Sequence, residues 1–223
     1  MTLTKYGWKQ WSCITVVLAI PLVVFIWLGW WIGVIAVVAL WLALVSFFRN
    51  PWRRIPTGLE TGTMLSPADG TISAIERVDH HGAIGGEALI IRIFLSVLNV
   101  HINRAPCACT LKEMIYTPGK FLDARTAESA QVNECNLLIF DNNGEPLGVR
   151  QVSGKIARHI VCPLKAGDSL TQGQQFGMIK YGSTTELILP RPDDVETKVN
   201  VGDKVKAGVT VFCVLNDSAI VTP

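Results

Sequence analysis

The tetrapeptide Tyr181-Gly182-Ser183-Thr184, near the end of the 223-residue chain, contains the residue types with which a polypeptide can cut itself. An activated serine hydroxyl attacks the carbonyl before it, and glycine leaves that carbonyl open because it has no Cβ and tolerates unusual backbone angles. Ester formation, elimination and hydrolysis would convert the remnant of Ser183 into a pyruvoyl group, an electrophile that needs no external cofactor. Gly-Ser-Thr also forms ordinary turns, so the motif needs support from other residues.

Two other segments contain groups that such a reaction requires. Asp69 lies in a Pro-Ala-Asp-Gly turn, where an aspartate either bonds its own backbone or orients a histidine. His101 follows an apolar run and shares one strand face with Asn103 if the period is two. A histidine in such a polar cluster is a candidate general base. The stretches 116–121 and 133–136 are polar and rich in turn residues, and form either ordinary loops or a headgroup pocket.

A long apolar segment precedes these groups. Residues 10–48 contain no charged side chain, whereas about 20 apolar residues cross a bilayer once. Basic residues stand on both sides of the segment, which favours two ends on the cytoplasmic side and therefore a helical hairpin. A single tilted helix or a cleaved signal peptide is the alternative. The flanking basic residues either set this topology or meet anionic headgroups: Lys5, Lys9, Arg49, Arg53 and Arg54.

Composition restricts the other functions. A net charge of +2 says little about partners, and we expect no nucleic acid among them. Six cysteines are scattered, and Cys107-Ala108-Cys109 has neither a second pair nor nearby histidines, so we expect no metal site. The chain contains no nucleotide-binding glycine motif.

The predicted organisation has three parts: a membrane-anchoring segment 1–50, a proline-bracketed linker 51–60 and a β-rich domain 61–223. Short apolar runs separated by turn residues predict strands at 70–75, 88–95, 137–140, 156–162, 187–189 and 209–215. Residues 167–173 and 202–208 share a Gly-Asp-x-aliphatic-x-x-Gly pattern, which is typical of barrel-sandwich or hammerhead-like β domains. The expected fold is therefore mainly β, of this class, with an N-terminal hydrophobic helical hairpin as an anchor.

Taken together, the motifs resemble the phosphatidylserine decarboxylase family in its short, membrane-anchored form. The matching stretches are 67–70, 100–106, 116–121, 133–134, 154–158 and 176–184, in family order. The resemblance implies a proenzyme that cleaves between Gly182 and Ser183 into chains 1–182 and 183–223. The two chains would stay associated, and a homodimer is left open.

The resemblance also implies a mechanism. A pyruvoyl group from Ser183 would form a Schiff base with the amine of phosphatidylserine, absorb the electrons left by CO2 and release phosphatidylethanolamine. Asp69 and a histidine would activate Ser183, and the histidine would later return a proton. We expect localisation at the cell membrane, with a cytoplasmic catalytic domain that binds the phospholipid substrate. The candidates for binding this substrate are Arg104, Asn103, Lys120, Arg158 and His159.

One position departs from the family pattern. Longer members carry a second histidine three residues after the one equivalent to His101, and this chain has Arg104 there. Either His101 takes over the activation of Ser183 or His159 approaches from another strand, and we favour His101. Two alternatives stay open: a non-catalytic, membrane-tethered barrel-sandwich adaptor, and a pyruvoyl decarboxylase that acts on a soluble amino acid.

Overall fold

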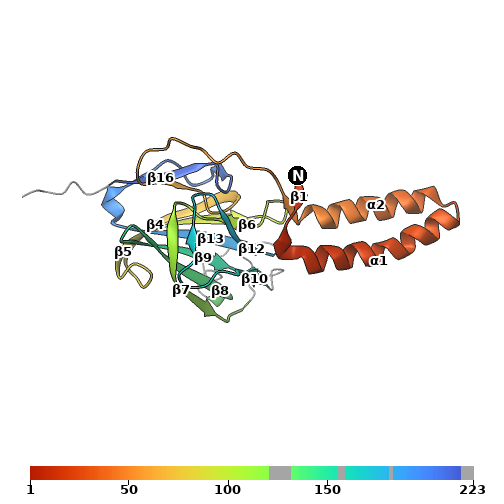
Figure 1. Cartoon of the computed structure of the whole chain (residues 1–223), viewed down its shortest axis with the longest axis horizontal. Helices are drawn as coiled ribbons and strands as arrows, with labels where there is room; N and C mark the ends of the chain where they lie inside the picture. Colours follow the sequence, from red (N-terminus) through yellow and green to blue (C-terminus); the bar gives the residue numbers. More distant parts are fainter. Residues whose placement is uncertain (121–131, 155–158, 181–182, 217–223) are drawn as a thin grey trace, which may run out of the picture. The chain divides into compact units, whose positions relative to one another are not determined.

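The computed structural model describes residues 1–120, 132–154, 159–180 and 183–216. Contacts between residues divide the chain into two units, Met1–Trp52 and Arg53–Pro223. Figure 1 shows that the first unit is a pair of helices and that the second is built from strands. The predicted mainly β fold with an N-terminal helical segment is confirmed.

The first unit is an antiparallel helical hairpin. A short 3₁₀ turn, Lys5–Gly7, leads into α1 (Trp8–Trp27), and α2 (Trp31–Ser46) returns after a turn in which Gly29 has a positive φ of 67°. Trp41 Nε1 on α2 donates to Thr15 Oγ1 on α1 at 3.0 Å. The strands β1 (Thr2–Leu3) and β2 (Arg49–Asn50) pair antiparallel and close the base of the hairpin. The predicted hairpin is therefore present, with its two ends side by side.

The two helices differ in length. Among the described residues, the helical segment Lys5–Trp27 is long and apolar enough to cross a bilayer, judged by its length and composition. At 1.5 Å per residue, α1 spans about 30 Å, the thickness of a hydrocarbon core, whereas α2 spans about 24 Å. Large apolar side chains are exposed along both helices, among them Ile20, Trp27, Ile32 and Ile35. The unit suits a membrane anchor.

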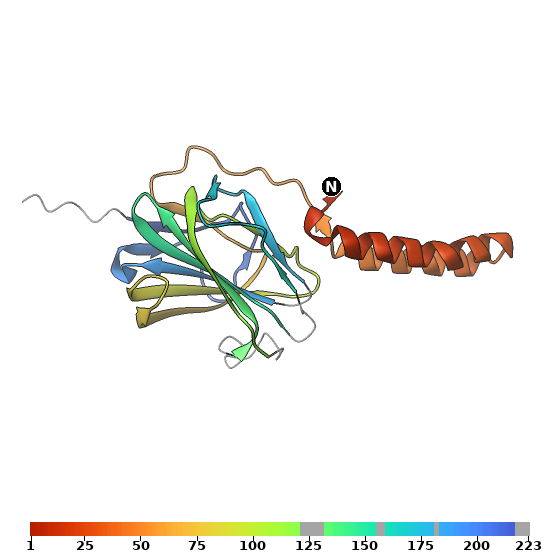
Figure 2. The same cartoon turned by 60° about the horizontal axis from the view of Figure 1, so that its bottom comes forward.

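An antiparallel eight-stranded sheet forms most of the second unit, and Figure 2 shows how strongly its long strands curve. The strand order is β11-β7-β8-β9-β13-β5-β4-β15, so β13 lies inside the sheet between β9 and β5. The strands are β4 (Gly70–His81), β5 (Gly86–Leu95), β7 (Cys109–Thr117), β8 (Cys135–Asn142), β9 (Glu145–Val152), β11 (Ser169–Leu170), β13 (Ser183–Pro190) and β15 (Lys204–Val205).

Two three-stranded sheets complete the unit, in the orders β10-β12-β6 and β14-β16-β3. Their strands, with one short 3₁₀ turn (Pro192–Asp194), are β3 (Thr63–Leu65), β6 (Ile102–Arg104), β10 (Ile160–Val161), β12 (Gln175–Ile179), β14 (Val195–Thr197) and β16 (Val211–Leu215). Phe176 on β12 and Phe212 on β16 belong to one buried cluster with Ile91, Ile93 and Leu187 of the large sheet. The small sheets therefore share a core with one face of the large sheet.

Side chains along β13 alternate between two faces, as they do in any strand. Leu187 and Leu189 belong to the main core, so the face that they share with Ser183 and Thr185 is called the inner face. Ile188 packs in a separate buried cluster, and the face that it shares with Thr184 and Glu186 is called the outer face.

The two glycine-rich segments form equivalent units, as their shared pattern predicted. Asp168 Oδ2 accepts from the backbone N–H of Lys165 at 2.9 Å, and Asp203 Oδ2 accepts from Asn200 N–H at 2.7 Å. Each turn leads into a two-residue strand, β11 against β7 in one case and β15 against β4 in the other. This repetition is the internal symmetry expected of a barrel-sandwich domain.

The same symmetry extends to the segments that carry candidate residues. Leu65 N–H donates to Pro106 O at 2.8 Å, and Arg104 N–H donates to Pro67 O at 3.0 Å. Gly208 N–H and Gly173 N–H bind the carbonyls of Ser66 and Ala105 in the same reciprocal way. In this correspondence Asp69 matches Ala108, so the aspartate is present in one half of the repeat and absent from the other.

Candidate active site

Ser183, the predicted reactive serine, is the first residue of β13. It lies opposite Leu95 of β5, and its side chain is fully buried. Its Oγ has no hydrogen-bond partner among the described residues. Gly182, the other half of the predicted cleavage site, lies outside the described part of the chain.

A row of polar side chains crosses the sheet at this end. Thr184 pairs with Val152 of β9, which places Ser153 beside Ser183. Ser153 N–H in turn donates to the carbonyl of Glu134, just before β8, at 2.9 Å. By strand alternation, Glu134 and Ser153 lie on the inner face with Ser183. We call these three residues the first polar row.

A second polar row lies one step deeper on the same face. Asn136 Nδ2 donates to Gln151 Oε1 at 3.1 Å, and Gln151 Nε2 donates to Asn103 Oδ1 at 2.9 Å. Asn103 Nδ2 then donates to Thr185 Oγ1 at 3.1 Å. All four side chains are buried. Their linked amides provide a rigid floor below the first polar row.

Unmet hydrogen-bonding capacity is concentrated here. Five buried side-chain oxygens have no hydrogen-bond partner within the described residues, and four of them lie at this sheet end: Ser183 Oγ, Ser153 Oγ, Glu134 Oε2 and Asn136 Oδ1. Leaving one buried polar group unsatisfied costs about 1–3 kcal/mol, so four at one sheet end point to a ligand or a reacting group.

His101 immediately precedes β6 and is fully buried. Its carbonyl accepts from Ile179 N–H at 3.1 Å, and its ring Nδ1 lies 3.0 Å from the carbonyl of Asn99. Because a carbonyl only accepts, Nδ1 carries the proton and Nε2 of the neutral ring is the basic nitrogen. The turn before it starts at Ser96, next to the partner of Ser183, so the backbone brings His101 and Ser183 to the same end of the domain.

Asp69 is held by two contacts in the turn before β4. Its Oδ2 pairs with Arg53 at 2.6 Å, and its Oδ1 accepts from the backbone N–H of Ala207 at 2.8 Å. Both side chains of this ion pair are nearly buried. From the sequence, Arg53 was expected to set topology or meet headgroups, and its pairing with Asp69 was not predicted.

The remaining predicted site residues lie in different surroundings. Arg104 Nη1 donates to Gly173 O at 2.8 Å, within the turn of the internal repeat. Lys120 is exposed, and its carbonyl accepts from Glu134 N–H at 3.1 Å. His159 is exposed, and its carbonyl accepts from Lys180 N–H at 3.3 Å, two residues before the predicted cut. Arg158 lies outside the described residues.

Burial acts in opposite ways on two other potential nucleophiles of the β unit. It lowers the pKa of Lys180, which favours the neutral, nucleophilic amine, and it raises the pKa of Cys213 to about 12, which leaves that thiol protonated at neutral pH. Within the described residues, no three His, Cys, Asp or Glu side chains gather as a metal site would require. The basic and nucleophilic groups at or next to this sheet end include His101, Glu134, Lys180 and Ser183.

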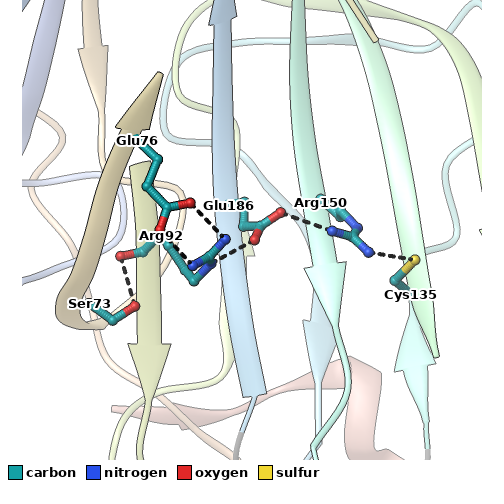
Figure 3. Close-up of polar contacts among 6 residues, drawn as sticks. All are labelled: Ser73, Glu76, Arg92, Cys135, Arg150 and Glu186. Carbon is teal, nitrogen blue, oxygen red and sulfur yellow. Dashed lines mark hydrogen bonds and ion pairs between the residues drawn. The ribbon is translucent and has the colours of Figure 1, made fainter. Parts of the chain in front are cut away.

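The outer face of β13 is organised differently, as Figure 3 shows. Glu186 is buried between two arginines on the neighbouring strands, with Arg92 Nε at 2.8 Å and Arg150 Nη1 at 3.3 Å. Arg92 also reaches Glu76 at 3.4 Å, and Arg150 donates to Cys135 Sγ at 3.6 Å. Both oxygens of Glu186 are therefore occupied.

Comparison with known proteins identifies the family. A family model described as phosphatidylserine decarboxylase matches residues 41–213, which include the whole sheet end described above. The chain belongs to the phosphatidylserine decarboxylase family. The predicted resemblance is confirmed, and the chain is an enzyme of the decarboxylase class.

Two relatives show how far the similarity extends. The chain is 45% identical over 167 residues to the phosphatidylserine decarboxylase proenzyme of Desulfotalea psychrophila, covering 74% of this chain and 76% of the relative. It is 39% identical over 211 residues to the phosphatidylserine decarboxylase proenzyme of Symbiobacterium thermophilum, covering 94% of each. The second match includes most of the helical hairpin as well as the β unit.

Several residues of this candidate site were not predicted from the sequence. Glu134 lies in a stretch for which both ordinary loops and a headgroup pocket were left open, and no role was assigned to it there. Ser153 and Gln151 carry no motif signal at all, because only the register of β9 against β13 brings them beside Ser183 and Thr185. A cross-strand pairing prediction could have found them.

Proposed function

We propose that this chain is a proenzyme that cleaves itself between Gly182 and Ser183 and then converts phosphatidylserine to phosphatidylethanolamine and CO2. The observation that carries the proposal is the buried Ser183 Oγ, which has no hydrogen-bond partner among the described residues. A buried hydroxyl without a partner is costly, and it is the atom that the cleavage would use. The relatives named proenzymes support the same reading.

Cleavage requires a base and a fixed hydroxyl. In our proposal, His101 Nε2 accepts the proton of Ser183 Oγ while the oxygen bonds to the carbonyl carbon of Gly182. The peptide C–N bond breaks, the proton passes to the nitrogen, and an ester results. The carbonyl of Asn99, which accepts from His101 Nδ1–H, is the proposed group that orients the histidine, because both oxygens of Asp69 are bound, one to Arg53 and one to Ala207 N–H. Elimination of the ester and hydrolysis with loss of ammonia leave a pyruvoyl group at position 183.

The residues around position 183 fit such a group. A ketone oxygen can accept a hydrogen bond there from the hydroxyl of Ser153, whose Oγ has no partner in the described part of the chain. Once formed, the pyruvoyl group supplies an electron sink for the decarboxylation. His101 is buried beside the same sheet end and is the proposed donor of the proton that replaces CO2 on the substrate.

The surface next to His101 suits a lipid substrate. The turn that precedes it carries Val97 and Leu98, which are 46% and 81% exposed. Its conformation is fixed by Asn99 Oδ1, which accepts from Ser96 N–H at 2.8 Å and from Ser96 Oγ at 2.7 Å. Apolar side chains on a rigid turn beside the catalytic group would contact acyl chains while the headgroup enters the site. This favours a membrane lipid over a soluble amino acid.

Location follows from the first unit. We propose that the helical hairpin anchors the enzyme in the cell membrane and that the β unit lies on the cytoplasmic side, because basic residues flank both ends of the apolar segment. The paired strands β1 and β2 support two ends on one side.

Intact mass spectrometry tests self-cleavage. The wild-type chain is expected to yield a 41-residue fragment, residues 183–223, with a blocked N-terminus. The Ser183→Ala chain is expected to stay whole and to release no CO2 from phosphatidylserine vesicles. Ser169→Ala, at an exposed serine of β11, is the matched control and is expected to behave like wild type.

Three outcomes would contradict the proposal. An unbroken wild-type chain that releases CO2 would overturn the pyruvoyl mechanism. A cleaved chain that decarboxylates free serine but not the phospholipid would favour the soluble substrate. A chain that neither cleaves nor decarboxylates would favour the non-catalytic adaptor.

A further inference from the structure

Glu134 is a buried carboxylate in the first polar row. It has no role in the proposed self-cleavage or in the proposed proton transfer from His101 to the substrate. Its Oε1 accepts from the Tyr116 hydroxyl at 2.9 Å, and its Oε2 has no hydrogen-bond partner among the described residues. Tyr116 is 58% exposed, so the pair extends from the surface of β7 to the row that contains Ser183. The hydrogen bond to Glu134 raises the pKa of Tyr116, which keeps the phenol protonated as the donor.

The polar side chains near Glu134 Oε2 indicate which charge a bound ligand would carry. Oxygens without a described partner are contributed by the carboxylate of Glu134, the amide of Asn136 and the hydroxyl of Ser153. The first two only accept hydrogen bonds. No ion pair in the described part of the chain involves Glu134, in contrast to Glu186, which two arginines neutralise. A cluster of acceptors with one uncompensated negative charge fits a cation that carries several N–H donors.

The serine headgroup carries such a cation. Its α-ammonium has three N–H donors, which match a carboxylate, an amide oxygen and a hydroxyl. An ammonium cannot attack a carbonyl carbon, because its nitrogen has no lone pair until one proton has left. A base next to position 183 would therefore speed the reaction at neutral pH, where only a small fraction of the amine is already deprotonated in water.

We propose that Glu134, Asn136 and Ser153 form the subsite for the ammonium group of the substrate, and that Glu134 Oε2 removes its proton. This inference rests on the proposed function. One N–H bond of the ammonium breaks and one O–H bond forms on Glu134. The nitrogen lone pair that is released then bonds to the carbonyl carbon at position 183. Asn136 and Ser153 accept from the remaining N–H groups and hold the nitrogen in place.

Capture of two amines by the cleaved protein tests the subsite. The probes are a short-chain phosphatidylserine in detergent micelles with cyanoborohydride, and methoxyamine, which is already neutral at pH 7 and needs no base. The readout is the mass of the 41-residue fragment over time. For Glu134→Gln, we expect phosphatidylserine capture at pH 7 to slow about 100-fold, and methoxyamine capture to change less than about twofold.

The pH profile provides a second readout. Without a base in the subsite, capture depends on the fraction of substrate that is already deprotonated in water. Phosphatidylserine capture by Glu134→Gln should therefore rise about tenfold per pH unit below the pKa of the amine, and more steeply than capture by wild type. Glu113→Gln, at an exposed glutamate of β7, is the matched control and is expected to keep the wild-type rates and profile.

The outcomes separate the inference from the function on which it rests. If wild type decarboxylates phosphatidylserine and Glu134→Gln captures it at the same rate, only the subsite is wrong. An equal loss of both amines would make Glu134 a structural support and would also overturn the proposal. If Glu134→Gln fails to fold or to cleave, Glu134→Asp, which keeps the carboxylate, must show the same selective loss in weaker form. A wild-type chain that cleaves and captures methoxyamine but ignores phosphatidylserine would overturn the proposed function itself.

Discussion

Both faces of β13 contain buried polar groups, but the two faces differ in whether these groups have hydrogen-bond or ion-pair partners. On the outer face, Glu186 is held by Arg92 and Arg150, and each arginine has a further partner. On the inner face, Ser183 has a buried oxygen without a described partner, as do its neighbours Ser153 and Glu134. The same strand therefore carries a completed polar network on one side and an incomplete one on the other.

The difference shows how a functional site can be distinguished from a structural network in one protein. A buried charge with all its partners stabilises one arrangement of strands and has no capacity left for a ligand. Buried oxygens without partners reduce stability, and they are retained where a substrate or reaction uses them. Perturbing each face should therefore change different measurements.

The largest stability effect is expected on the outer face. Replacing Glu186 by Gln leaves two arginines without their buried counter-charge, which should lower the free energy of unfolding by about 3 kcal/mol. Urea unfolding of Glu186→Gln in the uncleaved Ser183→Ala background measures this loss. The single variant Glu186→Gln, which keeps Ser183, should still release the 41-residue fragment. Glu76→Gln is the control at under about 1 kcal/mol, because Glu76 is half exposed and 3.4 Å from Arg92. Loss of cleavage in Glu186→Gln would remove the distinction between the faces.

A smaller stability effect with a catalytic consequence is expected on the inner face. Gln151→Met removes the amide that joins Asn136 to Asn103 and leaves Asn136 Nδ2 and Asn103 Oδ1 without their hydrogen bonds, which should cost about 2 kcal/mol. Because this row is the floor below Ser183, self-cleavage should also slow, as measured by the appearance of the small fragment on a denaturing gel. Gln174→Met, which removes only exposed hydrogen bonds from Thr171, should cost less than about 1 kcal/mol and leave cleavage near wild type. Normal cleavage in Gln151→Met would show that the floor does not position Ser183.

The smallest effect concerns pH and belongs to the outer side of the sheet. Burial lowers the pKa of His81 below 6.5, with Arg150 and His80 acting in the same direction and Glu186 opposing them. As pH falls through 6.5, the unfolded chain takes up the proton before the folded chain does, so stability declines from there towards the folded pKa. We expect a loss of under about 1 kcal/mol between pH 7.5 and pH 5.5.

His81→Asn should flatten this dependence. The asparagine oxygen can replace Nδ1 as the acceptor for the N–H of Ala83, now 3.1 Å away, but it does not titrate. Unfolding free energies at the two pH values measure the change. A variant that keeps the full wild-type slope would assign the acid sensitivity to another group.

The contrast between the faces also explains what could be predicted from sequence. The apolar run 187–189 predicted a strand there, and it forms the second half of β13. The strand itself begins earlier, at Ser183. Its first four residues, Ser-Thr-Thr-Glu, have no apolar pattern, and they are held as a strand by pairing with β5 and β9. The reactive residue therefore lies where local sequence gives the weakest structural signal.

Motifs and contacts were predictable to different degrees. The chemical character of Ser183, His101 and Asp69 was visible in the sequence, as was the repeated Gly-Asp turn, because each depends on residue type and short spacing. The pairing of Asp69 with Arg53 and the position of Ser153 depend on contacts between distant segments. The predicted strand at 156–162 is a two-residue strand, Ile160–Val161, and residues 155–158 lie outside the described part of the chain.

The place of β13 inside the large sheet has a consequence for a chain divided before Ser183. The piece 183–223 would contribute β13 between two neighbours, β15 against β4, and β16 against β3. It would therefore remain interwoven with the larger piece until both unravel together. Renaturation would then become a second-order event that slows on dilution, whereas the undivided precursor can regain its shape alone. The protein would therefore fold once, before cleavage, and the cleaved form would not readily refold after it unfolds.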